Sequence, residues 1–354
     1  MSSIVFNGSY ITKENTGIGV VSKDLLNSLS AEKITTLIPH DIGMKGDIYI
    51  PNNLSPGKGM KSHMRRLYWL QTVVPKIMKN LNAEYFLSPL LEAPLFTNVK
   101  SIVLAHDLIP LRYPSISFLS LYHLTYIPLI LKQSKLILCN SISTANDLNN
   151  FYQVPRQKLI PIKLGFNNEK YYPIKMIRKK FFLIIGRHNP HKNLDRVIRA
   201  FSFAKINNYK LVFVGSFDRR YTPSLMKLID ELNLRHLCVW KGWINDHEKL
   251  LLLNECQALI IASLWEGFGL PALEAMACGT PVIASEIGAL PEVIGEYGYL
   301  VNPFKIESIA FAMNSVINDK KCFEKALQKG PERAASFNWF STARAIEKII
   351  QDIV

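Results

Sequence analysis

Short apolar runs alternate with longer amphipathic stretches along the whole chain. In the first half, six apolar or β-branched runs end in polar or turn residues: "SIVFNGS", "KITTLIPHD", "DIYIPNN", "EYFLSP", "SIVLAHD" and "KLILCNS". Six more follow in the second half: "KKFFLIIGR", "YKLVFVGS", "LCVWKGW", "ALIIAS", "TPVIAS" and "GYLVNP". Continuous apolar strands that alternate with helices are typical of parallel sheets covered on both faces. The pattern predicts an α/β protein in which each half is a doubly wound, Rossmann-like unit.

One segment in the middle of the chain lacks an apolar period. Residues 166–180 are rich in Asn, Pro and Lys, and we expect a linker there. The 354 residues suit two domains of roughly 150 to 180 residues each. We expect an N-terminal domain over 1–165 and a C-terminal domain over 181–337, with a deep cleft between them.

The C-terminal tail, residues 338–354, predicts a helix. Phe340, Ala343, Ile346 and Ile350 form an apolar stripe at helical spacing. We expect this helix to return to the first domain and to pack on it.

Two further segments are open to more than one interpretation. Residues 113–131 contain no Asp, Glu, Lys or Arg, but their serines, prolines and tyrosines make a poor membrane span, so a buried helical hairpin is preferred. Residues 61–81 interleave Lys and Arg with apolar and aromatic residues. That pattern fits a helix lying on anionic lipid and, equally, a core helix with a solvated basic face.

Composition narrows the function classes. Hydrophobic residues make up 48% of the chain and charged residues 20%, which is typical of an ordinary globular protein. The five cysteines are scattered without a C-x-x-C pair, so neither a disulfide framework nor a zinc site is expected. The N-terminus does not resemble a signal peptide. We expect a cytoplasmic protein, with peripheral contact to the inner membrane face as an option.

The formal net charge of +14 calls for an anionic partner. Nucleic acid, an anionic membrane face and a phosphorylated substrate would all be attracted by it. Because the sequence has no zinc-finger spacing, RNP-type signature or basic-zipper pattern, nucleic acid is not expected.

Two clusters follow strands of the first half. In "TGIGVVSKDLLNSL", Gly17 and Gly19 precede an amphipathic helix, where backbone amides can approach a phosphate. In "VLAHDLIPLRYP", His106 and Asp107 end a buried strand. An imidazole there could exchange protons or hydrogen-bond a sugar hydroxyl near neutral pH, or serve as a plain polar cap.

Two more clusters follow strands of the second half. In "IIGRHNPHKNLDRVIRAF", Arg187 and Lys192 offer a planar fork of donors and a mobile ammonium, which suit a diphosphate. No third ligand is spaced to make a metal site with the nearby histidines, so no metal is expected. In "SLWEGFGLPALEAMACGTPVIAS", Pro271 suits the first turn of a helix, which places Glu266 in the loop and Glu274 near the helix start. We expect both carboxylates to face one pocket and to bind hydroxyl groups.

These residues resemble a known family. "EGFGLPALE" is similar to the Glu-x7-Glu motif of retaining glycosyltransferases of the GT-B fold, in particular the large glycosyltransferase family four group. "TGIGVVSKDLLNSL", "HDLIPLRYP", "NSISTANDL", "GRHNPHKNLDRVIRAF", "ACGTPVIASEIGALPEV" and "GYLVNP" fall in family order, and "SFNW" resembles the point where the last helix crosses back. The sequence departs from many members at Val20 and Val21, on the acceptor side.

The resemblance implies roles for individual residues. Arg187 and Lys192 would hold the diphosphate of a nucleotide sugar, Glu274 the ribose hydroxyls, and His106 would contact the transferred sugar as a catalytic residue with Glu266. The rest of the implied donor site comprises Gly17, Gly19, Gly215, Trp243, Ile244 and the amides of Phe268, Gly269 and Leu270.

The resemblance also implies the chemistry. Fixed cations would stabilise the charge that develops on the departing diphosphate, so neither a metal nor another cofactor would be required. The configuration at the anomeric carbon would be retained through a front-face reaction.

"HDLIPLRYP" resembles members that use GDP-mannose and build bacterial surface polysaccharide, including O-antigen, on lipid carriers. A UDP-sugar donor and a catalytically silent nucleotide-sugar-binding scaffold are the alternatives.

Overall fold

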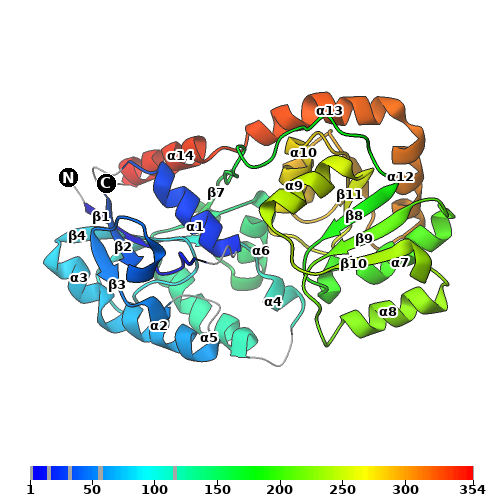
Figure 1. The fold of residues 1–354 in the computed structure, drawn as a ribbon. Helices are drawn as coiled ribbons and strands as arrows, with labels where there is room; N and C mark the ends of the chain where they lie inside the picture. Colours follow the sequence, from blue (N-terminus) through cyan, green and yellow to red (C-terminus); the bar gives the residue numbers. More distant parts are fainter. Residues whose placement is uncertain (1–2, 14–16, 31–33, 55–58, 115–117, 354) are drawn as a thin grey trace. The chain divides into compact units, whose positions relative to one another are not determined.

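The computed structural model describes residues 3–13, 17–30, 34–54, 59–114 and 118–353. The chain divides into two compact units. The first comprises Met1–Phe166 together with Asn338–Val354, and the second comprises Asn167–Phe337. Each unit is a parallel β-sheet with helices packed against it (Figure 1), which confirms the α/β class predicted from the alternating pattern.

The sheet of the first unit has seven parallel strands in the order β3-β2-β1-β4-β5-β6-β7. All six strands predicted for this half are present, and a short edge strand, β7, was not predicted. The bounds are β1 (Ser3–Asn7), β2 (Ile34–Pro39), β3 (Ile48–Ile50), β4 (Ala83–Ser88), β5 (Lys100–Ala105), β6 (Leu136–Cys139) and β7 (Leu159–Pro161). The chain leaves β1 toward β2 and returns to β4 on its other side. In such sheets the strand ends on either side of this reversal are the usual ligand site.

Six α-helices of the first unit are described before the linker, and one more comes from the C-terminal tail. They are α1 (Gly17–Ser28), α2 (Met60–Thr72), α3 (Val74–Asn80), α4 (Ile109–Arg112), α5 (Phe118–Gln133), α6 (Ile142–Tyr152) and α14 (Trp339–Ile353). Short 3-10 turns occur at His40–Ile42, Asn52–Leu54 and Arg156–Lys158. The core lies between sheet and helices, where Val5, Phe86 and Val103 are fully buried beside Leu70 and Val74.

The sheet of the second unit has six parallel strands in the order β10-β9-β8-β11-β12-β13, and all six were predicted. They are β8 (Phe181–Ile185), β9 (Lys210–Val214), β10 (Cys238–Lys241), β11 (Ala258–Ile261), β12 (Val282–Ser285) and β13 (Tyr299–Val301). The helices are α7 (Leu194–Ala204), α8 (Thr222–Glu231), α9 (Asp246–Glu255), α10 (Leu270–Ala277), α11 (Leu290–Ile294), α12 (Ile306–Asn318) and α13 (Lys320–Ala335), with 3-10 turns at Pro190–Lys192 and Arg235–Leu237.

The C-terminal tail forms α14 and packs on α1, within the first unit. Ala343, Ile346 and Ile350 are buried as predicted. Phe340 is not: 64% of it is exposed, and the guanidinium of Arg344 covers its ring. The predicted stripe was therefore wrong at its first position: in the first turn Thr342 is the buried residue, and its hydroxyl donates to the carbonyl oxygen of Lys163 at 2.7 Å.

The segment expected as a linker has no helix or strand over 167–180, but it is fastened to the second unit. The guanidinium of Arg178 donates to the carbonyl oxygens of Leu253, Cys256 and Gly279 and to the Thr280 hydroxyl, at 2.8 to 3.2 Å. The amide of Ile174 donates to Asn254 Oδ1 at 2.7 Å. These residues are therefore part of the second unit's fold rather than a free tether.

Two helical interpretations need correction. Residues 61–81 form two helices, since the chain turns at Val73 before Pro75 in the first turn of α3. Residues 118–133 form one helix, α5, instead of a buried hairpin, and one side of it is exposed. Within the described part of the chain, no helix has both the length and the apolarity that crossing a bilayer requires.

Candidate functional site

The ends of β8 and β9 approach each other closely at two glycines. A Cβ on Gly215 would lie 2.0 Å from the carbonyl oxygen of Gly186, so only glycine fits there. The Gly186 amide donates to Val214 at 2.9 Å, and the Gly215 amide donates to Lys241 at 3.2 Å. This contact fixes the backbone at the carboxyl edge of the second sheet, where the predicted donor residues begin.

Lys192 and Glu266 form an ion pair at this edge. The Lys192 ammonium lies 2.6 Å from Oε1 of Glu266, and the Ser263 hydroxyl donates to the same oxygen at 2.6 Å. Glu266 is 8% exposed. Because Lys192 follows β8 while Ser263 and Glu266 follow β11, the neighbouring positions of these two strands in the sheet bring the three side chains together.

A small cavity of about 10 Å³ lies beside this pair, large enough for about one water molecule. Gly186, Arg187, Lys192 and Ser263 are among its lining residues. Arg187 is exposed, and within the described residues it makes no ion pair or hydrogen bond. The Arg187 guanidinium is therefore an uncompensated cation, whereas the charge of nearby Lys192 is neutralised by Glu266.

Asn193 anchors the loop that carries Lys192. It is fully buried in a left-handed conformation with φ of 59°, and it precedes α7. Its side-chain amide donates to the carbonyl oxygens of Ala262 and Pro303 at 2.9 and 2.7 Å. These bonds tie the loop after β8 to the end of β11 and so hold Lys192 near Glu266.

The next part of the site is the start of α10. Gly269 precedes the helix with φ of 111°, and a Cβ on it would lie 2.7 Å from Leu290 Cδ2. The amides that begin a helix have no partner inside it and favour an electron-rich ligand. Phe268 and Gly269 lie on the loop between Glu266 and the helix, and Leu270 is the first residue of α10.

Glu274 lies on the fifth position of α10 and has its own cation. Its Oε1 accepts from the Lys249 ammonium at 2.8 Å, and Lys249 also lies over the ring of Tyr171. Burial raises the pKa of Glu274, and Lys249 opposes that rise. The expectation that both glutamates share a pocket is thus refined: each is held in a separate ion pair, Glu266 by Lys192 and Glu274 by Lys249.

The loop after β10 carries the expected base-side residues. Trp243 is 81% exposed and Ile244 is half-buried. The loop ends where Asn245 caps α9, its Oδ1 accepting from the Glu248 amide at 2.8 Å. The exposed indole of Trp243, on this loop, offers a flat apolar surface to an aromatic ring.

The two histidines between Arg187 and Lys192 are tied into the protein. His188 Nδ1 lies 2.7 Å from the Thr222 hydroxyl, and His191 is buried, which lowers its pKa to about 4. Over the residues that the structure describes, no cluster of three or more His, Cys, Asp or Glu side chains could hold a metal ion.

In the first unit, His106 lies just beyond the end of β5. Its Nε2 is 2.8 Å from the carbonyl oxygen of Pro89. Since a carbonyl only accepts, Nε2 carries the proton and Nδ1 is left as the acceptor. Burial lowers the pKa of His106, which the Pro89 bond and Asp107 only partly oppose, so the ring is neutral at pH 7. Asn140 donates to the His106 carbonyl at 2.7 Å and fixes its backbone.

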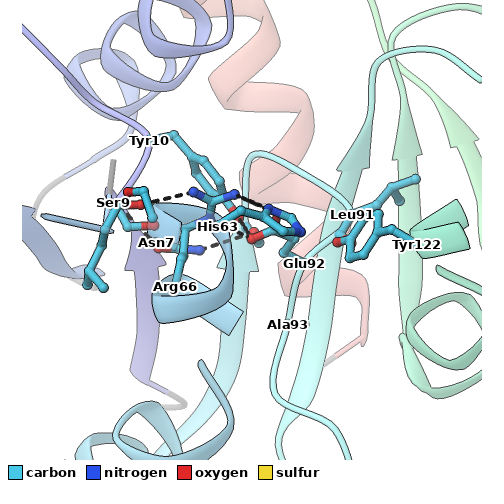
Figure 2. A network of polar contacts seen from close by, with 12 residues as sticks. Asn7, Ser9, Tyr10, His63, Arg66, Leu91, Glu92, Ala93 and Tyr122 are labelled. Carbon is cyan, nitrogen blue, oxygen red and sulfur yellow. Dashed lines mark hydrogen bonds and ion pairs between the residues drawn. The ribbon is translucent and has the colours of Figure 1, made fainter. Parts of the chain in front are cut away.

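A buried polar network lies at the ends of β1 and β4 (Figure 2). The Arg66 guanidinium donates to the Glu92 carboxylate from Nε at 2.7 Å and from Nη2 at 2.9 Å, and the Tyr10 hydroxyl donates to the same carboxylate at 2.8 Å. Burial alone would raise the pKa of Glu92, but Arg66 outweighs it and the pKa is lowered. Arg66 also donates to Nδ1 of His63 at 2.9 Å. The network fixes the loop after β4, which includes Pro89.

Gly17 and Gly19 are placed differently from the expectation. Both belong to the first turn of α1 instead of the loop before it, and Gly19 is buried. Gly17 is exposed at the helix start, with no atom within 4 Å of the position of a Cβ. The residues just before it, 14–16, lie outside the described part of the chain.

Several site residues were not predicted. Ser263 directly follows β11, and a polar residue at a strand end is a signal that could have found it. Lys249, Asn193 and the Arg66–Glu92 pair carry no comparable local signal, because their partners lie 25 to 110 residues away along the chain.

Comparison with known proteins finds similarity to sugar transferases. Residues 173–333 match the family model "Glycosyl transferases group 1". The chain is 26% identical over 269 residues to the serotype-specific mannosyltransferase WbdA of Escherichia coli, a match that covers 70% of this chain and 33% of WbdA. It is 28% identical over 250 residues to the O-antigen chain mannosyltransferase RfbU of Salmonella typhimurium, covering 70% and 69% of the two chains.

The fold is similar to that of Anabaena Alr3699/HepE in complex with UDP and glucose. The TM-score is 0.74 at 16% identity, over 99% of this chain and 100% of that one. The chain spans about a third of the length of the first curated relatives that it matches.

Proposed function

We propose that this chain, whose residues 173–333 match the group 1 glycosyl transferases, transfers a hexose from a nucleoside-diphosphate sugar to a glycan acceptor. The preferred donor is GDP-mannose, and the acceptor is a lipid-linked or polysaccharide glycan. Support for mannose comes from WbdA and RfbU, both named mannosyltransferases, at 26% and 28% identity.

The observation that carries the proposal is the charge arrangement around Lys192. A diphosphate brings two or more negative charges, and the carboxylate of Glu266 would repel it if left alone. Lys192 neutralises that carboxylate at 2.6 Å, and exposed Arg187 supplies the net positive charge. The site can thus hold a phosphate and a hydroxyl-binding carboxylate side by side, which is what a nucleotide sugar requires.

The remaining donor groups divide between sugar and nucleoside. Glu266 and the amides of Phe268, Gly269 and Leu270 accept from and donate to the hydroxyls of the transferred hexose. Glu274, held by Lys249, binds the ribose diol. The exposed indole of Trp243 provides a surface against which the base can stack. Ile244, Gly215 and the helix start at Gly17 and Gly19 complete the proposed donor contacts.

The proposed reaction retains the anomeric configuration. The bond between the anomeric carbon and the β-phosphate oxygen breaks, and its electron pair stays on the diphosphate, where Arg187 and Lys192 stabilise it. The acceptor oxygen bonds to the anomeric carbon from the same face, and its proton passes to the departing phosphate oxygen. His106, neutral at pH 7, accepts a hydrogen bond from a sugar hydroxyl through Nδ1. No metal ion takes part in this scheme.

A thermal-shift panel with GDP, UDP, ADP and CMP tests the donor. A ligand at 100 times its Kd adds about 2.7 kcal/mol of stability, which raises the midpoint of a protein of this size by a few degrees. We expect GDP alone to shift the wild type, and Arg187→Ala to lose the shift. Arg199→Ala is the matched control, since Arg199 is an exposed arginine on α7 of the same unit.

Each outcome decides something. A shift by UDP in place of GDP reassigns the sugar but keeps the transferase. The absence of a shift with every nucleotide would remove the proposal. Slow hydrolysis of the donor in the absence of acceptor separates a transferase from a catalytically silent nucleotide-sugar-binding scaffold, because the scaffold should release no sugar.

A further inference from the structure

Glu274 depends on neighbouring side chains for its orientation. Its side chain is only 13% exposed, and the Lys249 ammonium is its ion-pair partner, 2.8 Å from Oε1. A lysine ends in a point charge on a flexible four-carbon stem, so it attracts a carboxylate without fixing the direction in which the two oxygens point. A carboxylate that binds a diol has to present its oxygens in one fixed direction. A second and more rigid neighbour is therefore needed beside this pair.

Tyr171 is such a neighbour. It lies in the segment 167–180 and is 6% exposed. The Lys249 ammonium lies 4.9 Å from the centre of the Tyr171 ring, and the Tyr171 hydroxyl is hydrogen-bonded to the Glu274 carboxylate. One planar side chain thus contacts the cation through the face of its ring and the anion through its hydroxyl.

The Tyr171 hydroxyl is a donor in this contact. Burial raises the pKa of Tyr171, and the negative charges of Glu274 and Asp246 raise it further, so the phenol keeps its proton near pH 7. Burial also raises the pKa of Glu274, and the Lys249 ammonium and the Tyr171 hydroxyl both oppose that rise. The two neighbours favour the ionised form of Glu274, which accepts hydrogen bonds from hydroxyl groups.

The backbone on both sides of Tyr171 is attached to helix α9. After it, the carbonyl oxygen of Tyr172 accepts from the side-chain amide of Asn254 at 3.1 Å, and Asn254 is 2% exposed. Before it, Lys170 forms an exposed ion pair with Asp246 at 2.9 Å. The position of Tyr171 relative to α9 is therefore set from both directions along the chain.

We infer that Tyr171 is a positioning residue of the nucleotide site, which orients the Glu274 carboxylate so that both hydroxyls of a ribose donate to it. The inference rests on the proposed function, through the assignment of Glu274 to the ribose diol. It extends the site to the segment 167–180, which follows the first unit along the chain. The alternative is a tyrosine that only fills space, for which a phenylalanine would serve equally well.

Removal of the hydroxyl alone separates these two roles. Tyr171→Phe keeps the ring beside the Lys249 ammonium, and the affinities of the full chain for GDP and for dideoxy-GDP are measured by isothermal titration. In dideoxy-GDP, hydrogen replaces both ribose hydroxyls. The wild type should prefer GDP by at least about tenfold, because dideoxy-GDP makes no hydrogen bond to Glu274. Tyr171→Phe should bind GDP about tenfold more weakly and dideoxy-GDP with unchanged affinity, so that the preference is lost.

The matched control is Tyr172→Phe. It removes a hydroxyl from the next residue, whose side chain is 50% exposed, and it should retain both affinities. If the thermal-shift panel selects UDP, then UDP and dideoxy-UDP replace the two guanine ligands. The thermal midpoint without ligand, measured on every variant, reports folding.

A double-mutant cycle tests whether the hydroxyl acts through Glu274. Glu274→Gln should also lose the preference for the ribose diol. Adding Tyr171→Phe to it should then lower the GDP affinity by less than about twofold, because the carboxylate that the hydroxyl orients is already absent.

Three results would overturn the inference and leave the proposed transferase in place. The first is a Tyr171→Phe variant that binds both ligands as the wild type does, or that loses affinity for both equally. The second is a full tenfold loss on adding Tyr171→Phe to Glu274→Gln. The third is a wild type that binds GDP and dideoxy-GDP equally well. A wild type that binds no nucleotide would instead contradict the proposed function itself.

Discussion

The ammonium of Lys192 lies 2.6 Å from Oε1 of Glu266, although 74 residues separate them along the chain. The pair places a neutralised carboxylate at the edge of the sheet, next to the uncompensated guanidinium of Arg187. Its consequence is that the two residues should act as a unit: removing either one changes the charge that the other presents to a ligand.

Substitutions at this pair should therefore be non-additive. Lys192→Ala should weaken GDP binding by more than tenfold, because the diphosphate then meets the bare carboxylate of Glu266. Glu266→Gln should bind GDP as well as or better than the wild type, yet transfer sugar at least about 100-fold more slowly. The double variant should recover part of the GDP affinity lost in Lys192→Ala. Isothermal titration with GDP and a transfer assay would measure all three; simple additivity of the two affinity changes would contradict the pairing.

Loss of Arg187 should affect turnover more than folding. Arg187→Ala should lower kcat by about two to three orders of magnitude, by analogy with removal of one donor to a developing oxyanion. The thermal midpoint of the free protein should stay within about a degree of the wild type, since Arg187 is exposed and makes no ion pair or hydrogen bond among the described residues. Near wild-type turnover would show that this cation does not stabilise the leaving group.

Gly215 should be intolerant of any side chain. Gly215→Ala would drive a Cβ against the Gly186 carbonyl oxygen, now 2.0 Å from that position, and should cost about 3 kcal/mol of unfolding free energy. The GDP-induced shift should also disappear, because the loop bearing Arg187 must move. Gly242→Ala is the control at the end of the neighbouring strand β10, where no atom lies within 4 Å of the position of a Cβ, and it should change stability by less than about 0.5 kcal/mol. Denaturant melts of both variants would decide.

The buried Arg66–Glu92 pair should make stability depend on pH in a predictable direction. Since the pKa of Glu92 is lowered in the folded state, its contribution is present above the unfolded pKa of about 4.3 and is lost as the pH falls below it. Arg66→Met leaves a buried carboxylate without its cation and should cost about 3 to 5 kcal/mol at pH 7.

In Arg66→Met the same carboxylate keeps the Tyr10 hydrogen bond but loses its cation, so burial should raise its pKa and protonation should stabilise the variant. The stability gap to the wild type should therefore narrow between pH 7 and pH 4. Arg66→Met with Glu92→Leu should be more stable than Arg66→Met alone. A gap that stays constant with pH would mean that the charge on Glu92 is not what the arginine compensates.

Activity should depend on the neutral form of His106. Because burial lowers the pKa of this ring below 6.5, kcat/KM should be level near pH 7 and fall only as the pH drops below 6.5, through the lowered value. His106→Asn should transfer sugar more slowly and lose this limb of the pH profile. An unchanged profile in His106→Asn would assign the titration to another group and leave His106 as a structural cap.

Much of the fold was readable from the pattern of apolar residues. Runs such as "KLVFV" and "ALIIA" are apolar at consecutive positions, which is typical of a parallel strand buried on both faces of the sheet. The strand Leu159–Pro161 escaped because three residues at a sheet edge carry too short a signal. Helix α5 was misread for the opposite reason: it is apolar all round, so its sequence predicts burial on every side, whereas the first unit covers only one.

The sequence by itself determined which residue types stand at the strand ends: the cations at Arg187 and Lys192, the glutamates around Gly267 and Gly269, and the histidine at position 106. The tertiary structure decided their partners. Strand order and helix packing bring the charged nitrogen and a carboxylate oxygen within 3 Å of each other in three pairs: Lys192 with Glu266, Lys249 with Glu274, and Arg66 with Glu92. Spacing along the chain does not predict these pairs. The charge of a side chain is set by its own identity, whereas a partner 25 to 74 residues away is set by the topology of the whole sheet.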